Sequence, residues 1–327
     1  MDQSATPMGK ALATKDISPT LQAHPSLAFS KNGYTYRVET RGTHSTYTVS
    51  DGARTLALPI HWSAGAGEQT WILERDGHLY ESLVSYYPAI NGLDLTTGAE
   101  GFTPQTLEQA LGREMTANDS KTCFNCHATH AVVDGKLDLA SIKPGIACEH
   151  CHMGSNAHQA DAIRGNFKTA PPPLEEMSAE QTSNFCGQCH RTWETVVVNH
   201  WRGEANVRFQ PYRLANSKCF NGADPRIACT ACHDPHQNVV RKQISYDPAC
   251  LACHAPVLSD RSPFTPSKTA SPAIAAAQAP VAKACPVAKA NCVSCHMPKV
   301  TLPGGGGHLA FTDHEIRVVR PGDPYPN

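Results

Sequence analysis

The feature that most constrains this chain is a five-residue pattern, Cys-x-x-Cys-His, which occurs six times in 327 residues. Two cysteines three positions apart lie on one face of a helical turn, and the next residue can point its imidazole the same way. The pattern is typical of covalent haem c, in which two thioethers hold the porphyrin and the histidine binds iron. The predicted attachment residues are Cys123, Cys126, Cys148, Cys151, Cys186, Cys189, Cys229, Cys232, Cys250, Cys253, Cys292 and Cys295. The predicted proximal ligands are His127, His152, His190, His233, His254 and His296.

Zinc is the alternative occupant of such motifs. Zinc ribbons and knuckles also use Cys-x-x-Cys pairs, but they do not require a histidine directly after the second cysteine. Here all six pairs have one. The sequence therefore predicts six haem c groups and a hexahaem cytochrome.

Two cysteines are left over, because the motifs use twelve of the 14 in the chain. Haem c is attached outside the cytoplasmic membrane, where conditions are usually oxidising. We therefore expect a disulfide between Cys219 and Cys285, with two buried, unpaired thiols as the alternative. For the same reason we expect an exported protein, either periplasmic or extracellular. The first residues show no basic region followed by an apolar stretch, so we expect that the signal peptide has already been removed.

The composition excludes some classes of partner. No apolar run approaches the ~20 residues of a membrane span, so no transmembrane segment is predicted. The formal net charge of −1 gives no indication of nucleic-acid binding. With six haems in 327 residues, roughly 55 residues serve each haem, and the porphyrins are expected to form much of the core.

The first third of the chain contains no Cys-x-x-Cys-His motif, and its residue pattern is typical of β-strands joined by tight turns. Asn32-Gly33, Asp51-Gly52 and Asp76-Gly77 separate alternating polar and apolar stretches, which predicts an antiparallel meander over about residues 32–88. The expected fold class is mostly irregular, with short α-helices wrapped around six haems and an N-terminal antiparallel β-rich region. The expected domains are a haem-free region, 1–104, and a hexahaem domain, 105–327. The latter contains an Ala/Pro-rich excursion at 255–291, either a strap or a mobile loop.

The remaining histidines are candidates for the sixth coordination position of the irons. An electron carrier favours six-coordinate iron, whereas a catalytic haem keeps one position open. His130 and His236 each follow a proximal histidine by three residues, so they cannot reach the other face of the same haem and are predicted to bind a neighbouring one. The full set of distal candidates is His130, His158, His200, His236, His308 and His314. In the β-region, His24, His44, His61 and His78 are expected to be ordinary solvated or packed residues.

Several stretches resemble multihaem c-type cytochromes related to the tetrahaem cytochrome of ammonia oxidisers. The resemblance extends to the group in which this haem module accompanies tetratricopeptide repeats. It is carried by Gly145-Ile-Ala-Cys-Glu-His-Cys-His152, Cys232-His-Asp-Pro-His236, Cys285-Pro-Val287, Cys292-Val-Ser-Cys-His-Met-Pro-Lys299 and Phe311-Thr-Asp-His-Glu-Ile316, and upstream by Glu74-Arg-Asp-Gly77 and Val84-Ser-Tyr-Tyr87. It implies closely spaced bis-histidine haems with His236, His308 and His314 as distal ligands. The chain departs from the group at His150 and at Gly154-Ser-Asn-Ala-His158.

We predict that the chain is an electron carrier without catalytic activity, passing electrons along six haems outside the cytoplasmic membrane. Its expected partners are redox proteins or extracellular electron acceptors. A sharper version adds self-association into a conductive extracellular filament. The alternatives are an oxidoreductase for nitrogen or sulfur oxyanions with one open haem, and an electron-transfer subunit of a larger complex. A motif ending in Lys, as in nitrite reductases, does not occur.

Overall fold

The computed structural model describes residues 3–14, 18–152, 155–166, 177–254 and 285–326. Two compact units make up the chain: Met1–Pro172 with Leu302–Leu309, and Pro173–Thr301 with Ala310–Asn327. Two motifs therefore belong to the first unit and four to the second. Most of the predicted Ala/Pro-rich excursion, 255–284, lies outside the described residues.

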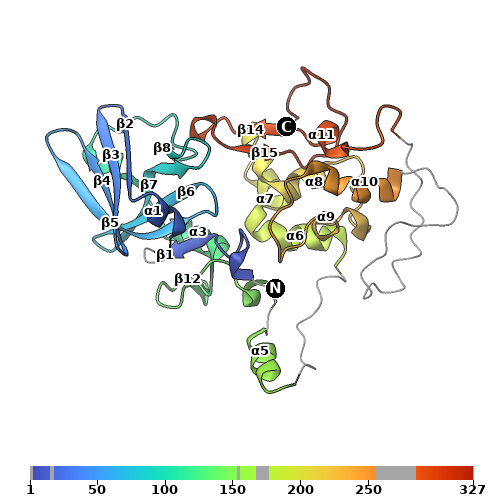
Figure 1. Cartoon of the computed structure of the whole chain (residues 1–327), viewed down its shortest axis with the longest axis horizontal. Helices are drawn as coiled ribbons and strands as arrows, with labels where there is room; N and C mark the ends of the chain where they lie inside the picture. The colour runs from blue at the N-terminus through green and yellow to red at the C-terminus, as the bar shows by residue number, and fades with distance from the viewer. Residues whose placement is uncertain (1–2, 15–17, 153–154, 167–176, 255–284, 327) are drawn as a thin grey trace. The chain divides into compact units, whose positions relative to one another are not determined.

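The first unit is built on an antiparallel sheet in which seven strands, β2 to β8, neighbour one another in chain order (Figure 1). β1 pairs with β5, and β9 pairs with β7. The strands are β1 (Leu12–Thr14), β2 (Ser26–Lys31), β3 (Tyr34–Arg41), β4 (His44–Ser50), β5 (Thr55–Ala64), β6 (Gln69–Arg75), β7 (His78–Tyr87), β8 (Gly92–Leu95) and β9 (Gly112–Glu114).

The turns of this meander are those that the sequence predicts. Asn32 and Gly33 have φ of 54° and 82°, and Asp76 and Gly77 have φ of 52° and 80°. Two successive positive φ values make the tight turn whose twist matches that of the flanking strands. At the third predicted turn, the Asp51 carboxylate accepts two backbone N–H groups of its own loop. The predicted meander is confirmed, and it extends beyond 32–88 at both ends.

The largest apolar core of the first unit lies inside the curl of this sheet. Tyr36, Tyr47 and Trp71 are at most 1% exposed and form its centre with branched aliphatic neighbours. Register shifts interrupt the β5–β6 and β6–β7 ladders, and such bulges increase strand twist. The end strands β2 and β8 contact each other, with Lys31 Nζ 3.8 Å from Asp94 Oδ1. The sheet is therefore curled almost into a barrel.

A second core joins the sheet to the helix that carries the first motif. Phe124, the residue after the first motif cysteine, is fully buried and meets Trp62 of β5 edge to face, with ring centroids 5.2 Å apart. Leu12 and Met115 pack in the same cluster. The helices of this unit are α1 (Pro19–Ala23), α2 (Leu107–Leu111), α3 (Ala117–His127), α4 (Cys148–Cys151) and α5 (Ser155–Ile163). Its short strands are β10 (Ala128–Thr129), β11 (Val132–Val133), β12 (Lys136–Leu137) and β13 (Lys143–Pro144).

In its described ranges, 177–254 and 285–326, the second unit contains short helices and one two-stranded sheet. Its helices are α6 (Ala179–His190), α7 (Trp193–Val198), α8 (Gln210–Ala215), α9 (Cys229–Cys232), α10 (Asp247–His254) and α11 (Cys292–His296), and its strands are β14 (Lys299–Thr301) and β15 (Ala310–Thr312). A small buried cluster, Val196, Phe209 and Tyr212, joins α7 and α8. Within the described ranges, no helix is long and apolar enough to cross a membrane.

The predicted fold class is wrong. The largest element is the sheet of nine strands, which holds the main apolar core of its unit. The helices are too short to dominate the architecture. The prediction gave the haem motifs too much weight. Alternating burial along β3 and β4, and continuous burial along the second half of β7, build a core of conventional size, so the β-region is a principal structural element.

Candidate haem-binding site

Each of the six motifs lies on a helical turn. α3, α6 and α10 end at the histidines of the first, third and fifth motifs, and α4, α9 and α11 begin at the first cysteines of the others. Capping boxes start α3 at Thr116 and α6 at Ser178, with Asp119 and Gln181 as the reciprocal partners. The helical turn places both cysteines of a motif on one side, as the spacing predicts.

Two proximal histidines are oriented by backbone carbonyl groups. His127 Nδ1 lies 2.9 Å from the oxygen of Ala11, and His296 Nδ1 lies 2.9 Å from that of Arg317. A carbonyl oxygen only accepts, so each Nδ1 carries the proton and each Nε2 keeps its lone pair. Metal-binding histidines are held in this way by a second partner. The residues present therefore fit a haem whose iron is bound by Nε2.

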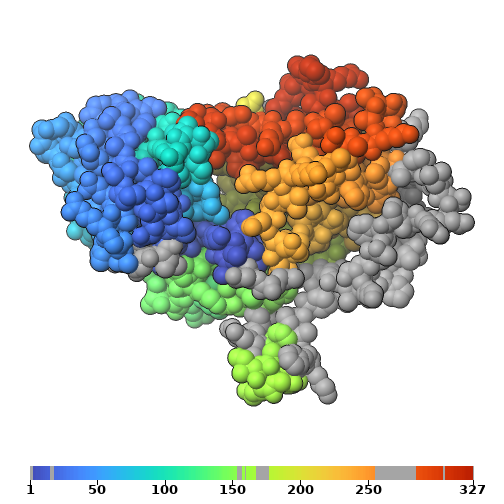
Figure 2. All heavy atoms as spheres, viewed as in Figure 1, coloured from blue at the N-terminus to red at the C-terminus, as the bar shows by residue number. Residues whose placement is uncertain are grey.

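The N-terminal segment holds the first two motifs together, and sequence reasoning did not predict this. Besides the Ala11 carbonyl, the Met8 carbonyl accepts the backbone N–H of Ile146, just before the second motif, at 3.0 Å. Gly145 approaches so closely that a Cβ there would lie 1.9 Å from the carbonyl oxygen of Gly9. In Figure 2 the N-terminal residues, in dark blue, lie beside the green residues of these motifs.

His130 lies beside the second motif. β10 and β13 pair antiparallel and bring the residues after the first motif alongside those before the second. His130 has φ of 57° and its Nε2 is 3.5 Å from Oε1 of Glu149, which lies between the cysteines of the second motif. Lys143 also contacts this carboxylate, at 2.6 Å. The position suits a ligand to the neighbouring haem, and that role stays a prediction.

In the second unit, four motifs follow one another in space. α6, which carries the third motif, packs against α9, which carries the fourth, and a hydrogen bond with the Cys186 thiol lowers the pKa of Cys229 to about 7. α10, which carries the fifth motif, contacts the short 3-10 turn Pro225–Ile227 that precedes the fourth motif. α10 and α11, which carry the fifth and sixth motifs, contact each other.

One buried carboxylate ties the last two motifs together. Asp247 begins α10, is 5% exposed, and accepts the backbone N–H groups of Asn291 at 2.6 Å and Cys292 at 2.9 Å. Asn291 itself provides no side-chain cap for α11. Asp247 therefore caps the helix of the sixth motif from the helix of the fifth.

His314 is the predicted distal ligand with the clearest partner. Its ring centroid lies 6.1 Å from that of the proximal His233, with an interplanar angle of 40°. An imidazole nitrogen bound to a metal at about 2.0 Å places its ring centroid about 3 Å away, so two axial imidazoles lie about 6 Å apart. His314 Nδ1 is 2.9 Å from the Thr312 carbonyl oxygen, which leaves Nε2 for iron. Burial lowers the pKa of His314 to about 4, so the ring is neutral as ligation requires.

The other distal candidates lie in varied surroundings. His308 Nε2 is 3.0 Å from Asp94 Oδ2, so binding iron through that nitrogen would break this contact. His236 Nδ1 is 3.3 Å from Asp234, and His200 is exposed with φ of 53°. His158 Nδ1 is buried with no hydrogen-bond partner among the described residues. Their roles as ligands stay predictions.

Two histidines of the β-region have polar partners within their own unit. His24 Nε2 is 2.9 Å from the Tyr86 hydroxyl, and His78 Nδ1 is 2.8 Å from Glu114. Cys219 and Cys285 are both exposed with free thiols, and the disulfide between them stays a prediction.

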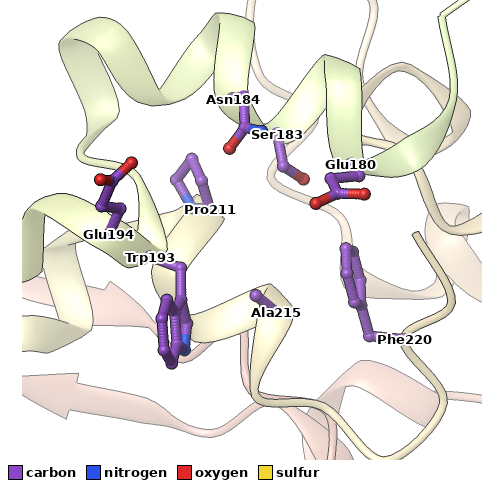
Figure 3. Close-up of a pocket in the computed structure, with 8 residues that line it drawn as sticks. All are labelled: Glu180, Ser183, Asn184, Trp193, Glu194, Pro211, Ala215 and Phe220. Carbon is purple, nitrogen blue, oxygen red and sulfur yellow. The ribbon is translucent and has the colours of Figure 1, made fainter. Parts of the chain in front are cut away.

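A pocket of about 340 Å³ lies beside the helix of the third motif (Figure 3). Glu180, Ser183 and Asn184 line it from α6, at a spacing that presents a different face of the helix from Cys186 and Cys189. The Glu180 and Glu194 carboxylates stand on opposite sides of it. Two carboxylates would repel haem propionates, so no haem is assigned to this pocket.

The model of the family described as Cytochrome c554 and c-prime matches residues 99–153 of this chain. No curated protein and no solved structure gave a significant match. The matched segment contains the first two motifs, His130, and Gly145, which packs against the N-terminal segment. Together with the oriented histidines and the repeated motif, this match supports placing the chain among the c-type cytochromes in general.

Proposed function

We propose that this chain transfers electrons through six covalently bound haems, outside the cytoplasmic membrane, and does not itself catalyse a substrate reaction. When bound, haem supplies an iron that changes between the ferric and ferrous states. The cysteines of each motif would hold it, and the following histidine would bind the iron. Electron transfer by a cytochrome is supported by the family match at the first two motifs.

The observation that carries the proposal is the serial contact of the four motifs in the second unit. The helices of the third and fourth motifs contact each other, as do those of the fifth and sixth, and the turn just before the fourth motif contacts the helix of the fifth. Motifs in contact would hold their haems at short distances from one another. Stepwise electron transfer between neighbouring haems requires such short distances. The first two motifs form a separate pair in the first unit. We therefore infer a group of two haems and a group of four.

The haem count and the ligation state test this proposal. The mass of the intact protein and a pyridine haemochrome assay should both give six haems per chain. Low-temperature EPR of the oxidised protein should show low-spin signals. A count below six would overturn the hexahaem proposal. A high-spin haem that binds cyanide or nitrite would favour the oxidoreductase.

Variants can locate individual haems. Replacing both cysteines of the fifth motif by serine should remove one haem and slow electron passage from the fourth motif to the sixth. The matched control replaces Cys219, which is outside the motifs, by serine and should keep six haems. Stopped-flow reduction measures the passage, and equal rates in both variants would refute serial transfer through the second unit.

Self-association into a filament is the finer form of this proposal. It is supported by the small number of residues per motif, roughly 55, which leaves haem edges near the surface for contact with a second copy. Negative-stain microscopy across a concentration series tests it. Filaments with a regular repeat are expected, and discrete particles at every concentration would refute self-association.

A further inference from the structure

Arg213 is a fully buried cation in the second unit. Its side chain is 1% exposed, on α8, in a fold where charged groups are normally solvated. Its Nε and Nη2 atoms lie 2.8 Å and 2.9 Å from the two carboxylate oxygens of Asp313, and Nη2 is also 2.7 Å from Glu315. The Tyr325 ring covers the guanidinium at 4.5 Å, and the Pro326 carbonyl accepts from Nη1 at 3.1 Å. Among the described residues, all of these partners of the guanidinium come from the C-terminal segment.

The two carboxylates held by Arg213 flank His314 in the sequence. β15 ends at Thr312, so His314 lies on non-repetitive backbone without a strand ladder to fix it. Ser217, one turn after Arg213, donates to the His314 carbonyl at 3.2 Å and accepts the Ile316 N–H at 2.8 Å. Arg213 of α8 therefore holds the side chains on both sides of this histidine, and Ser217 holds the backbone of His314 and Ile316.

We propose that Arg213 is the positioning residue for His314, holding its imidazole opposite His233 so that the iron between them stays six-coordinate. This inference rests on the proposed function, in which His314 is an axial ligand. The bidentate contact fixes direction as well as distance, because the planar guanidinium matches both carboxylate oxygens at once. A lysine would supply a positive charge from a single ammonium group, without the two parallel N–H donors of the guanidinium.

A purely structural ion pair makes a different prediction. A buried pair contributes little net stability, because desolvation offsets the attraction, whereas removing one partner leaves the other charge buried and is costly. A structural role would therefore lower the unfolding midpoint and leave the iron ligation of folded protein unchanged. A positioning role changes ligation in protein that is still folded.

Binding of carbon monoxide by the reduced, haem-loaded protein separates the two roles, because carbon monoxide binds only an iron with an open position. The reference variant His314→Ala should bind about one more carbon monoxide per chain than the wild type and gain a high-spin ferric EPR signal. Arg213→Met should gain more than half of that binding. Arg213→Lys and the milder Ser217→Ala should each gain less than Arg213→Met but more than the wild type.

The matched control is Arg226→Met, which removes another arginine of the same unit that is paired with an aspartate, Asp224, at 2.6 Å. It should bind no more carbon monoxide than the wild type. If His314→Ala opens an iron and folded Arg213→Met does not, the positioning role is refuted while the ligand assignment stands. If Arg213→Met does not load haem, the other two variants decide. The positioning role is refuted if Arg213→Lys and Ser217→Ala both bind no more carbon monoxide than the wild type. If His314→Ala opens no iron, the ligand assignment itself fails, and the positioning role with it.

Discussion

Replacing Phe124 by alanine should detach the first motif from the sheet. Phe124 is fully buried, meets Trp62 edge to face at 5.2 Å, and packs in the core that contains Met115. Truncating a buried phenylalanine costs about 3–5 kcal/mol. For a unit of this size, each kcal/mol shifts the unfolding midpoint by about 2–4 °C, so Phe124→Ala should lower it by about 10 °C.

The assay is thermal unfolding of the haem-loaded protein, followed by far-UV circular dichroism for the sheet and by Soret absorbance for the haems. Phe102→Ala is the matched control, because Phe102 belongs to the same unit but is 43% exposed. It should change the midpoint by no more than about 2 °C. Equal shifts in the two variants would refute the argument that α3 is anchored through this aromatic contact.

Three further predictions concern other parts of the site. Gly145→Ala should unfold the first unit several degrees earlier than Gly135→Ala; both have positive φ, but a Cβ at 145 would lie 1.9 Å from a backbone oxygen and one at 135 would lie in open space. Asp247→Ala should cost about 3 kcal/mol in urea unfolding, because two backbone N–H groups at the start of α11 lose a charged acceptor; a change below about 0.5 kcal/mol would contradict the cap. Burial lowers the pKa of His314 to about 4 in the folded protein, whereas a histidine in the unfolded chain has a pKa of about 6.5. The contribution of the neutral imidazole to the free energy of unfolding is therefore complete above pH ~6.5. It falls by about 1.4 kcal/mol per pH unit as the pH is lowered toward 4. His314→Phe should flatten this dependence, measured as urea midpoints at pH 7 and 4.5.

Local features of this fold can be predicted from the sequence because their signals are local. The Asn32-Gly33 turn has the positive φ values that its residue types favour, and the cysteine spacing gives the helical turns of the motifs. The capping box at Thr116 is also written in the sequence and could have marked the start of α3. The weight of the sheet in the fold was underestimated, because Asn-Gly and Asp-Gly pairs locate individual hairpins but do not show how far the sheet curls on itself.

Long-range contacts of the site could not be predicted in this way. The carbonyl of Ala11 orients His127 across 116 residues, and any residue type would supply that oxygen. The Arg213–Asp313 contact spans 100 residues. An arginine and an aspartate in a chain with 28 basic and 29 acidic residues carry no signal of their pairing. Such contacts depend on the tertiary fold.

The cap that Asp247 supplies to α11 ties together two points of the chain that lie 44 residues apart, since its partner is Asn291. Once the ends of a loop are fastened, its closure entropy grows only with the logarithm of its length, so doubling the number of residues costs about 0.6 kcal/mol. Insertion and deletion between the fifth and sixth motifs are therefore thermodynamically cheap. An affinity tag or a whole reporter domain inserted there should leave the two motifs in register, which makes this connection the natural place to immobilise the protein on an electrode.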